Sequence, residues 1–438
     1  MESAKLPSHF TFPKELKDRI LFTIGVLILY RIGVQIPTPG VDRSAVVEAF
    51  AQRGGGVFSL LNTFTGGALE QFSILALGIL PYITASIIFQ LLQTGVPYLE
   101  QLKKEGESGR KKINQYTRYA TVLLSIFQGY GLSRGFFGQE SIVSISHFAF
   151  MSFQFFTIMT LTAGSCILMW LGEQINEKGV GNGASLLIFA GIAAGIPQGT
   201  ANLWAMIQKG EMSGGLGLGL SLFMIFIVGF IIFLETGQRR IPVQYSQRAL
   251  GNKQPTAQMS HLPLKLNFSG VIPPIFASSL LLFPSTIAQF TQAEWAQKLQ
   301  ESFSLTGSIF NILFVVFIIF LCFFYTEVVF NPNEMSDNLK KYGGFIPGIR
   351  AGQPTSDYVK KILDRLTVAG AIYLATVCVM PNILIDQLKI PFYFGGTSLL
   401  ILVGVALDTA QQIQSHLLTA RYEGMVKGVR VKSRRVHF

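Results

Sequence analysis

The sequence predicts an all-α polytopic membrane protein in which ten transmembrane helices form two inverted halves of five. Three observations support this prediction: the composition, a series of ten apolar runs and a motif that occurs twice. Half of the 438 residues are hydrophobic, only 13% are charged, and the mean hydropathy is +0.44. A soluble domain usually has about a quarter of its residues charged, so this chain lacks the charge needed to cover a core of its size.

Ten apolar runs divide the chain. They occupy residues 20–36, 73–94, 117–136, 151–172, 183–198, 215–235, 269–289, 307–330, 367–385 and 395–413. Runs of about twenty apolar residues match the hydrocarbon thickness of a bilayer. The fifth run is short and rich in Gly and Ala, so we expect it to pack among other helices. The polar start of the chain lacks the pattern of a removable signal peptide.

The charges of the loops predict the orientation. Ten crossings place both ends of the chain on one side, and most of the 35 Lys and Arg residues lie on that side. The opposite loops contain only Arg43, Arg53, Arg134, Lys209, Lys298 and Lys389. By the positive-inside rule both termini are cytoplasmic. The basic excess would then face anionic lipids and cytoplasmic partners.

One short motif occurs in both halves. Residues 80–86 read LPYITAS and residues 272–278 read IPPIFAS, and each motif begins the second span of its half. A duplication of five spans produces halves of opposite orientation, because five is odd. We therefore expect halves at residues 1–205 and 206–438. The alternative is a chance similarity between residues that are common in membrane helices.

The sequence predicts no enzyme, no cofactor and no metal site. It contains no GxxxxGK[ST] phosphate-binding loop. The histidines are scattered and share no metal-ligand spacing, and the cysteines lie singly in apolar runs. These residues are His9, His147, His261, His416, His437, Cys166, Cys322 and Cys378.

Carboxylates are scarce in the middle of the spans. Glu235, Glu327 and Asp408 lie near the predicted cytoplasmic ends, whereas proton and sodium relays need carboxylates at membrane depth. This disfavours a secondary transporter of a small solute with an inverted repeat. That interpretation stays open as the alternative.

A short segment after the first span has an unusual length. In residues 59–72, SLLNTFTGGALEQF, the apolar spacing predicts a helix from Ser59 to Thr65 that ends at Gly66 and Gly67. Such a helix is too short to span a bilayer. It is tolerated at membrane depth only where protein or a water-filled cavity surrounds it. The alternative is an interfacial helix on the outer leaflet.

Two cytoplasmic loops, residues 237–268 and 331–366, are long for connections between packed spans. The alternation in RRIPVQYSQR, residues 239–248, predicts an ordered hairpin. In the second loop, Gly and Pro residues surround Arg350 and indicate a shaped contact tip. The alternative is that the basic loops rest on anionic lipid.

Seven stretches together resemble the SecY family, the channel subunit of the bacterial protein translocase. They are RIGVQIPTPGV (31–41), GGALEQFSILALGILPYITASIIFQLL (66–92), GVGNGASLLIFAGI (179–192), RRIPVQYSQR (239–248), GVIPPIFASSLLLFP (270–284), GGFIPGIRAGQPT (343–355) and PFYFGGTSLLI (391–401). One departure is Ala351, where the family commonly has proline.

The resemblance implies a clamshell of two halves around an hourglass pore, and it implies four sets of site residues. The pore ring would be Ile83, Ile87, Ile188, Ile275 and Ile401. The plug would be Ser59, Leu60, Leu61, Asn62, Thr63, Phe64, Thr65, Gly66, Gly67 and Ala68. The lateral gate would include Thr84, Ser86, Ser278 and Ser279 in spans 2 and 7, beside spans 3 and 8. Arg239, Arg240, Arg248 and Arg350 would dock a motor or a ribosome.

The resemblance also implies the function and the partners. The chain would conduct unfolded precursor polypeptides across the bacterial cytoplasmic membrane and release hydrophobic segments sideways into lipid. Signal sequences would enter at the lateral gate. Energy would come from the SecA ATPase or a translating ribosome, and the small subunits SecE and SecG would be membrane partners.

Overall fold

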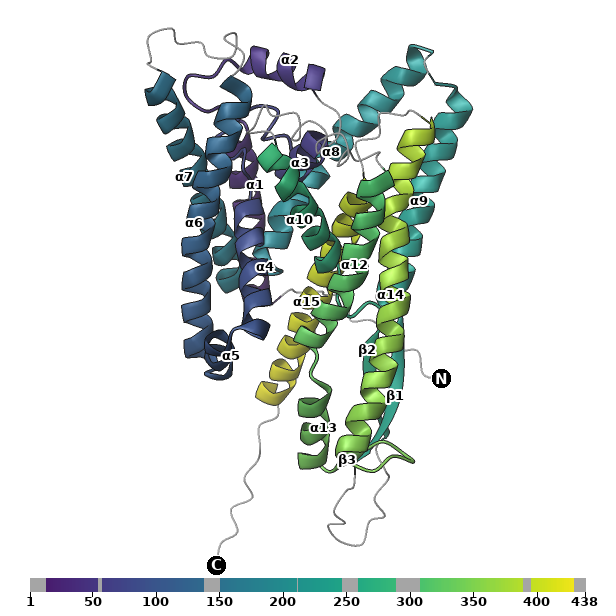
Figure 1. Cartoon of the computed structure of the whole chain (residues 1–438). Coiled ribbons are helices and arrows are strands. Elements are labelled where there is room, and N and C mark those ends of the chain that lie inside the picture. The colour runs from purple at the N-terminus through teal and green to yellow at the C-terminus, as the bar shows by residue number, and fades with distance from the viewer. Residues whose placement is uncertain are drawn as a thin grey trace, which may run out of the picture.

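The computed structural model describes residues 13–53, 57–137, 150–210, 212–245, 259–288, 308–388 and 395–428. Each of the ten predicted apolar runs contains a helix or most of one (Figure 1). These helices are α1 (Lys14–Val34), α4 (Leu80–Gly95), α6 (Glu107–Phe137), α7 (Phe150–Lys178), α8 (Gly183–Gln208), α9 (Gly214–Thr236), α10 (Ile272–Ala288), α12 (Ser308–Val329), α14 (Gln353–Leu388) and α15 (Gly396–Gly428).

Shorter elements lie at the two ends of the bundle (Figure 1). At one end are α2 (Arg43–Arg53) and α3 (Val57–Thr65). At the other end are α5 (Pro97–Lys104), α13 (Pro332–Lys341) and the strands β1 (Gln238–Tyr245), β2 (Met259–Lys265) and β3 (Gly344–Phe345). One end of the bundle therefore has strands and short helices, and the other end has two short helices.

Within the described ranges, six helical segments are long and apolar enough to cross a membrane by length and composition. They are Phe153–Lys178, Gly183–Gln208, Gly214–Thr236, Ile309–Lys341, Gln353–Pro381 and Gly396–Thr419. The other apolar runs lie in α1, α4, α6 and α10. Of these, α4 and α10 have only 16 and 17 residues.

The short length of α4 corrects one expectation. The predicted span began at Ser73, but Ser73 forms an isolated β-bridge with Pro37, residues 74–79 form turns, and the helix starts at Leu80. The physical reason is local: Gly78 adopts a positive φ of 61°, and Pro81 is favourable only in the first turn of a helix. A non-helical segment at membrane depth is tolerated here because Ser73 and Leu75 are buried in protein.

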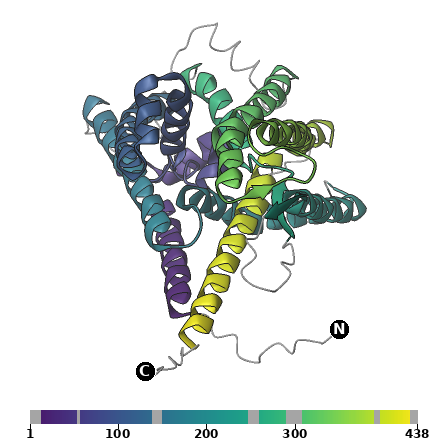
Figure 2. The same cartoon turned by 90° about the horizontal axis from the view of Figure 1, so that it is seen from below.

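The helices form two groups. Seen from below, the purple and blue helices lie on one side and the green helices on the other (Figure 2). Helices of the predicted first half contact helices of the predicted second half. These contacts include α4 with α10, and α1 and α8 with α15. The predicted boundary after residue 205 lies inside α8, which ends at Gln208. The exact boundary between the halves stays a prediction.

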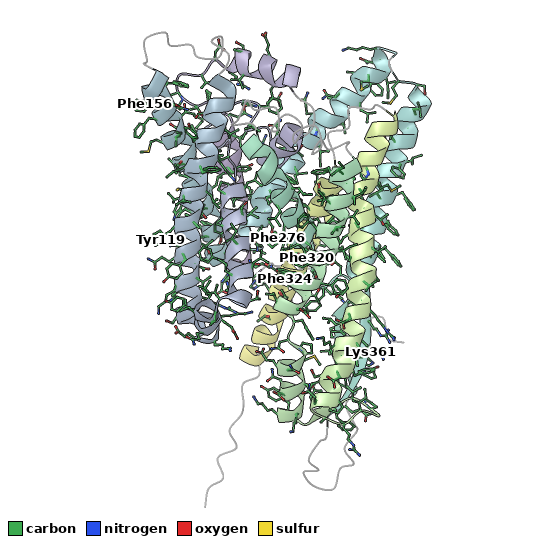
Figure 3. All side chains as sticks on the ribbon, viewed as in Figure 1. Tyr119, Phe156, Phe276, Phe320, Phe324 and Lys361 are labelled. Carbon is green, nitrogen blue, oxygen red and sulfur yellow. The ribbon has the colours of Figure 1, made fainter. Side chains whose placement is uncertain are left out.

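Large apolar side chains cover much of the outer surface. Leu123 of α6, Phe233 of α9 and Ile312 of α12 are each more than 60% exposed. Tyr119 and Phe156 project outward from the helices that carry them (Figure 3). An apolar exterior of this extent is what a lipid-facing surface requires, because lipid chains do not penalise exposed Leu or Phe.

The two long loops fold together into one small sheet. Strand β1 pairs antiparallel with β2, with Ile241 opposite Leu262, so the predicted hairpin is confirmed. Strand β1 also pairs with β3, with Gln244 opposite Phe345. The sheet order is β2-β1-β3. The sequence did not predict β3, because two residues are too few for a strand pattern.

Candidate functional site

The two copies of the repeated motif have the same structure. Pro81 of α4 and Pro273 of α10 both lie in the first helical turn. Each helix is preceded, two residues before its first residue, by a glycine with positive φ: 61° at Gly78 and 65° at Gly270. The similarity that the sequence predicted for residues 80–86 and 272–278 therefore extends to the backbone.

The burial of the two motifs is also matched. Ile83 is 7% exposed and Ile275 is 6% exposed, and the alanines two residues later, Ala85 and Ala277, are both completely buried. Residues two apart lie on opposite sides of an α-helix, so both helices are surrounded by protein on more than one side at this level. The two isoleucines therefore occupy matching buried positions.

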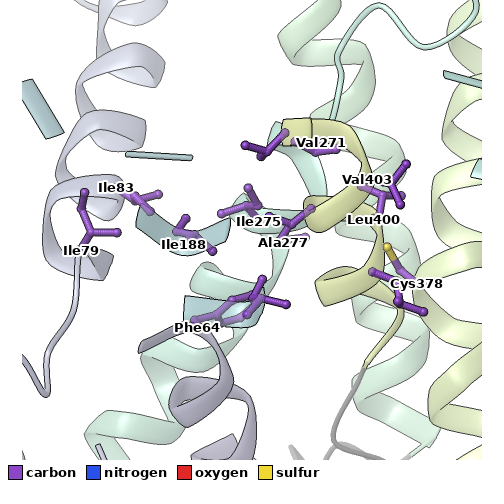
Figure 4. Close-up of a cluster of buried hydrophobic side chains, with 14 of the residues drawn as sticks. Phe64, Ile79, Ile83, Ile188, Val271, Ile275, Ala277, Cys378, Leu400 and Val403 are labelled. Atoms are coloured by element: carbon purple, nitrogen blue, oxygen red, sulfur yellow. The ribbon is translucent and has the colours of Figure 1, made fainter. Parts of the chain in front are cut away.

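The five predicted ring residues belong to one buried apolar cluster that also contains Phe64 of α3. The exposed fractions are 7% at Ile83, 2% at Ile87, 2% at Ile188, 6% at Ile275 and 0% at Ile401. Figure 4 shows Ile83, Ile188 and Ile275 in one row, with Phe64 beside them. The structure thus brings together residues from α4, α8, α10 and α15. Their role as a pore ring stays a prediction.

The expected short helix is present as α3, with nine residues from Val57 to Thr65. It ends where predicted, at Gly66 and Gly67, whose φ angles are 67° and 86°. The amide of Gly67 donates to the carbonyl of Asn62 at 2.9 Å. Glycine tolerates this left-handed conformation without a side-chain clash.

The C-terminal end of helix α3 is buried among the longer helices. Phe64 is 5% exposed and Thr65 is 2% exposed, and α3 contacts α8. The side chains of Ser59 and Leu60 lie outside the described residues. This placement disfavours the alternative of an interfacial helix on the outer leaflet, because such a helix would bury its apolar face in lipid.

Hydrogen bonds hold the segment that follows α3. The side-chain amide of Asn62 donates to Glu70 Oε2, and the backbone amide of Glu70 donates to Asn62 Oδ1, both at 3.0 Å. Farther along, the amide of Thr38 donates to the carbonyl of Phe72 at 2.9 Å. The C-terminal side of α3 is therefore anchored to its surroundings.

The four predicted gate hydroxyls bond along their own helices. Thr84 donates to the carbonyl of Leu80 at 3.0 Å, and Ser86 accepts from Gln90 at 3.2 Å. Ser278 and Ser279 donate to the carbonyl of Ile275, at 2.8 and 2.9 Å. Helices α4 and α10 contact each other. Within the described ranges, none of the hydrogen bonds made by these four side chains crosses from α4 to α10.

Three of the predicted docking arginines lie on the strand-bearing face. Arg239 and Arg240 are exposed on β1, and Arg350 is exposed in the loop after β3. Arg248 lies outside the described residues. The pairing of β3 with β1 brings the two loops together, which sequence reasoning did not foresee.

The loop that presents Arg350 has a defined shape. Gly343, Gly348 and Gly352 adopt positive φ angles of 70°, 83° and 105°. The hydroxyl of Thr355 donates to the carbonyl of Arg350 at 2.8 Å. Ile346, which follows β3, is buried in a small core with Ile241 and Val359. The guanidinium is thus displayed on a fixed backbone.

The arrangement is the fold of protein-conducting channels. A solved structure described as that of a protein-conducting channel matches with a TM-score of 0.66, at 18% identity, over 95% of both chains. A SecY structure described through the role of its plug domain in the closed state matches with a TM-score of 0.64, at 18% identity, over 94% of this chain and 95% of that one. Sec61 in a canine ribosome–channel complex matches with a TM-score of 0.63, at 17% identity, over 95% of both chains.

Sequence comparison is more specific. The family profile described as SecY matches residues 73–410. The protein translocase subunit SecY of Pseudomonas aeruginosa is 47% identical over 422 residues, which is 95% of each chain. The corresponding subunit of Escherichia coli is 46% identical over 425 residues, again 95% of each chain. The chain belongs to the SecY family, as the seven stretches predicted.

Proposed function

We propose that this chain is a protein-conducting channel, not an enzyme, in the bacterial cytoplasmic membrane. It moves unfolded precursor polypeptides across the membrane and releases hydrophobic segments sideways into lipid. The observation that carries the proposal is the apolar cluster at the junction of α4, α8, α10 and α15, with α3 packed beside it. The membership in the SecY family supports the same function.

The apolar cluster forms the seal of the idle channel. Branched apolar side chains at Ile83, Ile188 and Ile275 exclude water, and a dewetted constriction blocks ions. These side chains neither donate nor accept hydrogen bonds. A passing polypeptide therefore meets no side chain that selects for its sequence.

Helix α3 is the plug of the channel. It moves away when a signal sequence enters, and the polypeptide then crosses through the space it leaves. A helix of nine residues suits this role because it is too short to span the bilayer and can move separately from the spans. Gly66 and Gly67 provide backbone freedom at its C-terminal end.

The contact between α4 and α10 is the lateral gate. Because the hydroxyls of Thr84, Ser86, Ser278 and Ser279 bond within their own helices, the two helices can separate without leaving these groups unpaired. A hydrophobic segment can then partition from the pore into lipid.

Energy and docking come from outside the chain. The sequence has no nucleotide-binding loop, so the SecA ATPase or a translating ribosome drives transport. Both would dock on the face that displays Arg239, Arg240 and Arg350, and one of the solved channels of this fold is a ribosome complex. SecE and SecG are the membrane subunits, both termini are cytoplasmic, and anionic lipids face the basic loops.

A secondary transporter of a small solute is not favoured. Such a carrier needs polar groups at a midplane site between its repeats. The corresponding junction here is lined by isoleucines that are at most 7% exposed. The family membership also supports a channel and not a carrier.

The deciding experiment is reconstitution of the chain with SecE and SecG in vesicles. Added SecA, ATP and a precursor protein should yield precursor that is protected from external protease. A precursor that stays fully digestible, with active SecA bound to the vesicles, would contradict the proposal. A precursor without its signal sequence is the matched control.

A further inference from the structure

Two adjacent side chains of α1 bind the C-terminal end of α3. The hydroxyl of Tyr30 donates to the carbonyl of Thr65 at 3.0 Å. The Nη1 atom of Arg31 donates to the carbonyl of Gly66 at 2.9 Å. Thr65 is the last residue of α3 and Gly66 is the next residue, so both bonds reach the same end of the short helix.

These two carbonyls are the groups that most need donors. The last carbonyls of a helix have no partner within the helix, and the C-terminal end carries partial negative charge that attracts a cation. Tyr30 is 3% exposed and Thr65 is 2% exposed. Loss of the bond between them would leave a buried carbonyl without that donor, which is costly away from water.

Arg31 has no carboxylate partner in the described part of the chain. A guanidinium within a membrane helix normally pairs with an acid or with backbone carbonyls. Here the bonded acceptor is the backbone of the segment that ends α3. Departure of α3 would therefore remove the acceptor that Arg31 has in the closed arrangement.

The same helix end also packs against α8. A Cβ atom added to Gly66 would lie 2.6 Å from the Cα atom of Gly191. A Cβ atom added to Gly191 would lie 3.0 Å from the carbonyl oxygen of Phe64. The end of α3 is therefore closely packed, with donors from α1 and the backbone of α8 both in contact with it.

We propose that the side chains of Tyr30 and Arg31 form a latch. This latch holds the plug, helix α3, in place in the idle channel. The inference rests on the proposed role of α3 as the plug. Plug release requires both bonds to break, so the latch sets how readily the channel opens. Its residues are positioning residues, because they act on the plug and not on the translocating chain.

The test measures ion conductance of idle channels, reconstituted with SecE and SecG, in planar bilayers. Tyr30→Phe removes the hydroxyl alone, and Arg31→Gln removes the charge. Each should raise the open fraction about threefold to tenfold, as expected for loss of one hydrogen bond. The double variant should leak more than either single variant. Both single variants, Tyr30→Phe and Arg31→Gln, should also admit precursors with defective signal sequences.

Matched controls separate the latch from general damage. Tyr119→Phe changes a tyrosine that is 63% exposed, and Arg19→Gln removes an exposed arginine of the same helix. Both should keep the parent conductance. Arg31→Lys keeps a cation at the helix end and should leak less than Arg31→Gln. Thermal unfolding of each purified complex checks that the variants fold.

Deletion of residues 57–65 distinguishes failure of the latch from failure of the plug. A leaking deletion variant together with ion-tight Tyr30→Phe and Arg31→Gln channels would overturn the latch and leave the plug. A deletion variant as tight as the parent would overturn both assignments. We expect the deletion variant and the latch variants to leak ions. The control variants should keep the parent conductance.

Discussion

The start of α4 and the start of α10 have the same motif, the same backbone and the same burial, but their surroundings differ. A Cβ atom added to Gly78 would lie 2.8 Å from Cγ2 of Thr65, at the end of α3. At Gly270 nothing lies within 4 Å of such an atom. The two helix starts are thus matched, but the glycine before α4 packs against the end of the short helix, whereas the glycine before α10 has open space around it.

The supports before the two helices differ as well. Before α10, the side-chain amide of Asn267 donates to Glu235 Oε1 at 2.7 Å and to the carbonyl of Gly270 at 3.0 Å. Before α4, backbone bonds hold the chain, such as that from the amide of Ile74 to the carbonyl of Ile36 at 3.0 Å. The second half also carries the sheet and Arg350. In the proposed function, the contact with the plug therefore lies on the α4 side and the docking face on the α10 side.

The largest expected effect is on docking, and it should occur without a change in the closed state of the channel. Arg350→Glu should reduce SecA-driven translocation at least tenfold, because reversal of an exposed charge turns attraction at a contact into repulsion. Protease protection of a precursor in vesicles measures the effect. Idle conductance and insertion should match the parent. Normal transport by this variant would show that Arg350 has no docking role.

A polar residue in the apolar cluster should break closure without affecting docking. Ile401→Asn, Ile275→Asn and Ile83→Asn should each favour the open state by about 1–3 kcal/mol, because the closed state leaves the amide unpaired. Idle channels should then leak ions and admit precursors with defective signal sequences. Planar-bilayer conductance measures the leak.

The matched burial of Ile83 and Ile275 sharpens this second prediction. Since their exposed fractions are 7% and 6%, the two variants should leak to a similar extent. A leak at only one of them would mean that the two helix starts do not contribute equally to the seal. Ion-tight behaviour of Ile401→Asn would identify that residue as ordinary packing.

Substitution of Gly78 and of Gly270 should distinguish the start of α4 from the start of α10. Gly78→Ala and Gly270→Ala should each lower the free energy of unfolding by roughly 1–2 kcal/mol, because alanine disfavours a positive φ. Only Gly78→Ala should also raise idle conductance, since its Cβ atom pushes on Thr65. Thermal unfolding and conductance, measured on the same preparations, test both parts. Equal conductance in the two variants would contradict the asymmetry.

The smallest expected effect concerns the polar support of α10. Asn267→Ala removes the donor to Glu235 and should lower the free energy of unfolding by about 1 kcal/mol. Thermal unfolding of the purified complex measures it, with the exposed Asn338 as a matched site for Asn338→Ala. Idle conductance should stay at the parent level. A leaking Asn267→Ala channel would show that this polar support also helps to hold the channel closed.

The sequence by itself determined the features that depend on local patterns. The ten apolar runs predicted ten helices, because burial in lipid is set by a continuous stretch of side chains. The two heptapeptides predicted equivalent helix starts. Gly66 and Gly67 predicted the end of α3, since glycine adopts a left-handed backbone without steric cost and this depends on local sequence.

Only the tertiary structure decided the features that join distant parts of the chain. Tyr30 and Arg31 lie 35 residues before the carbonyls they bind, and no pattern in α1 marks them for that contact. The same holds for Gly191 against Gly66 and for the pairing of β3 with β1. These contacts depend on how separate helices and loops pack, and packing is a property of surfaces that meet only after folding.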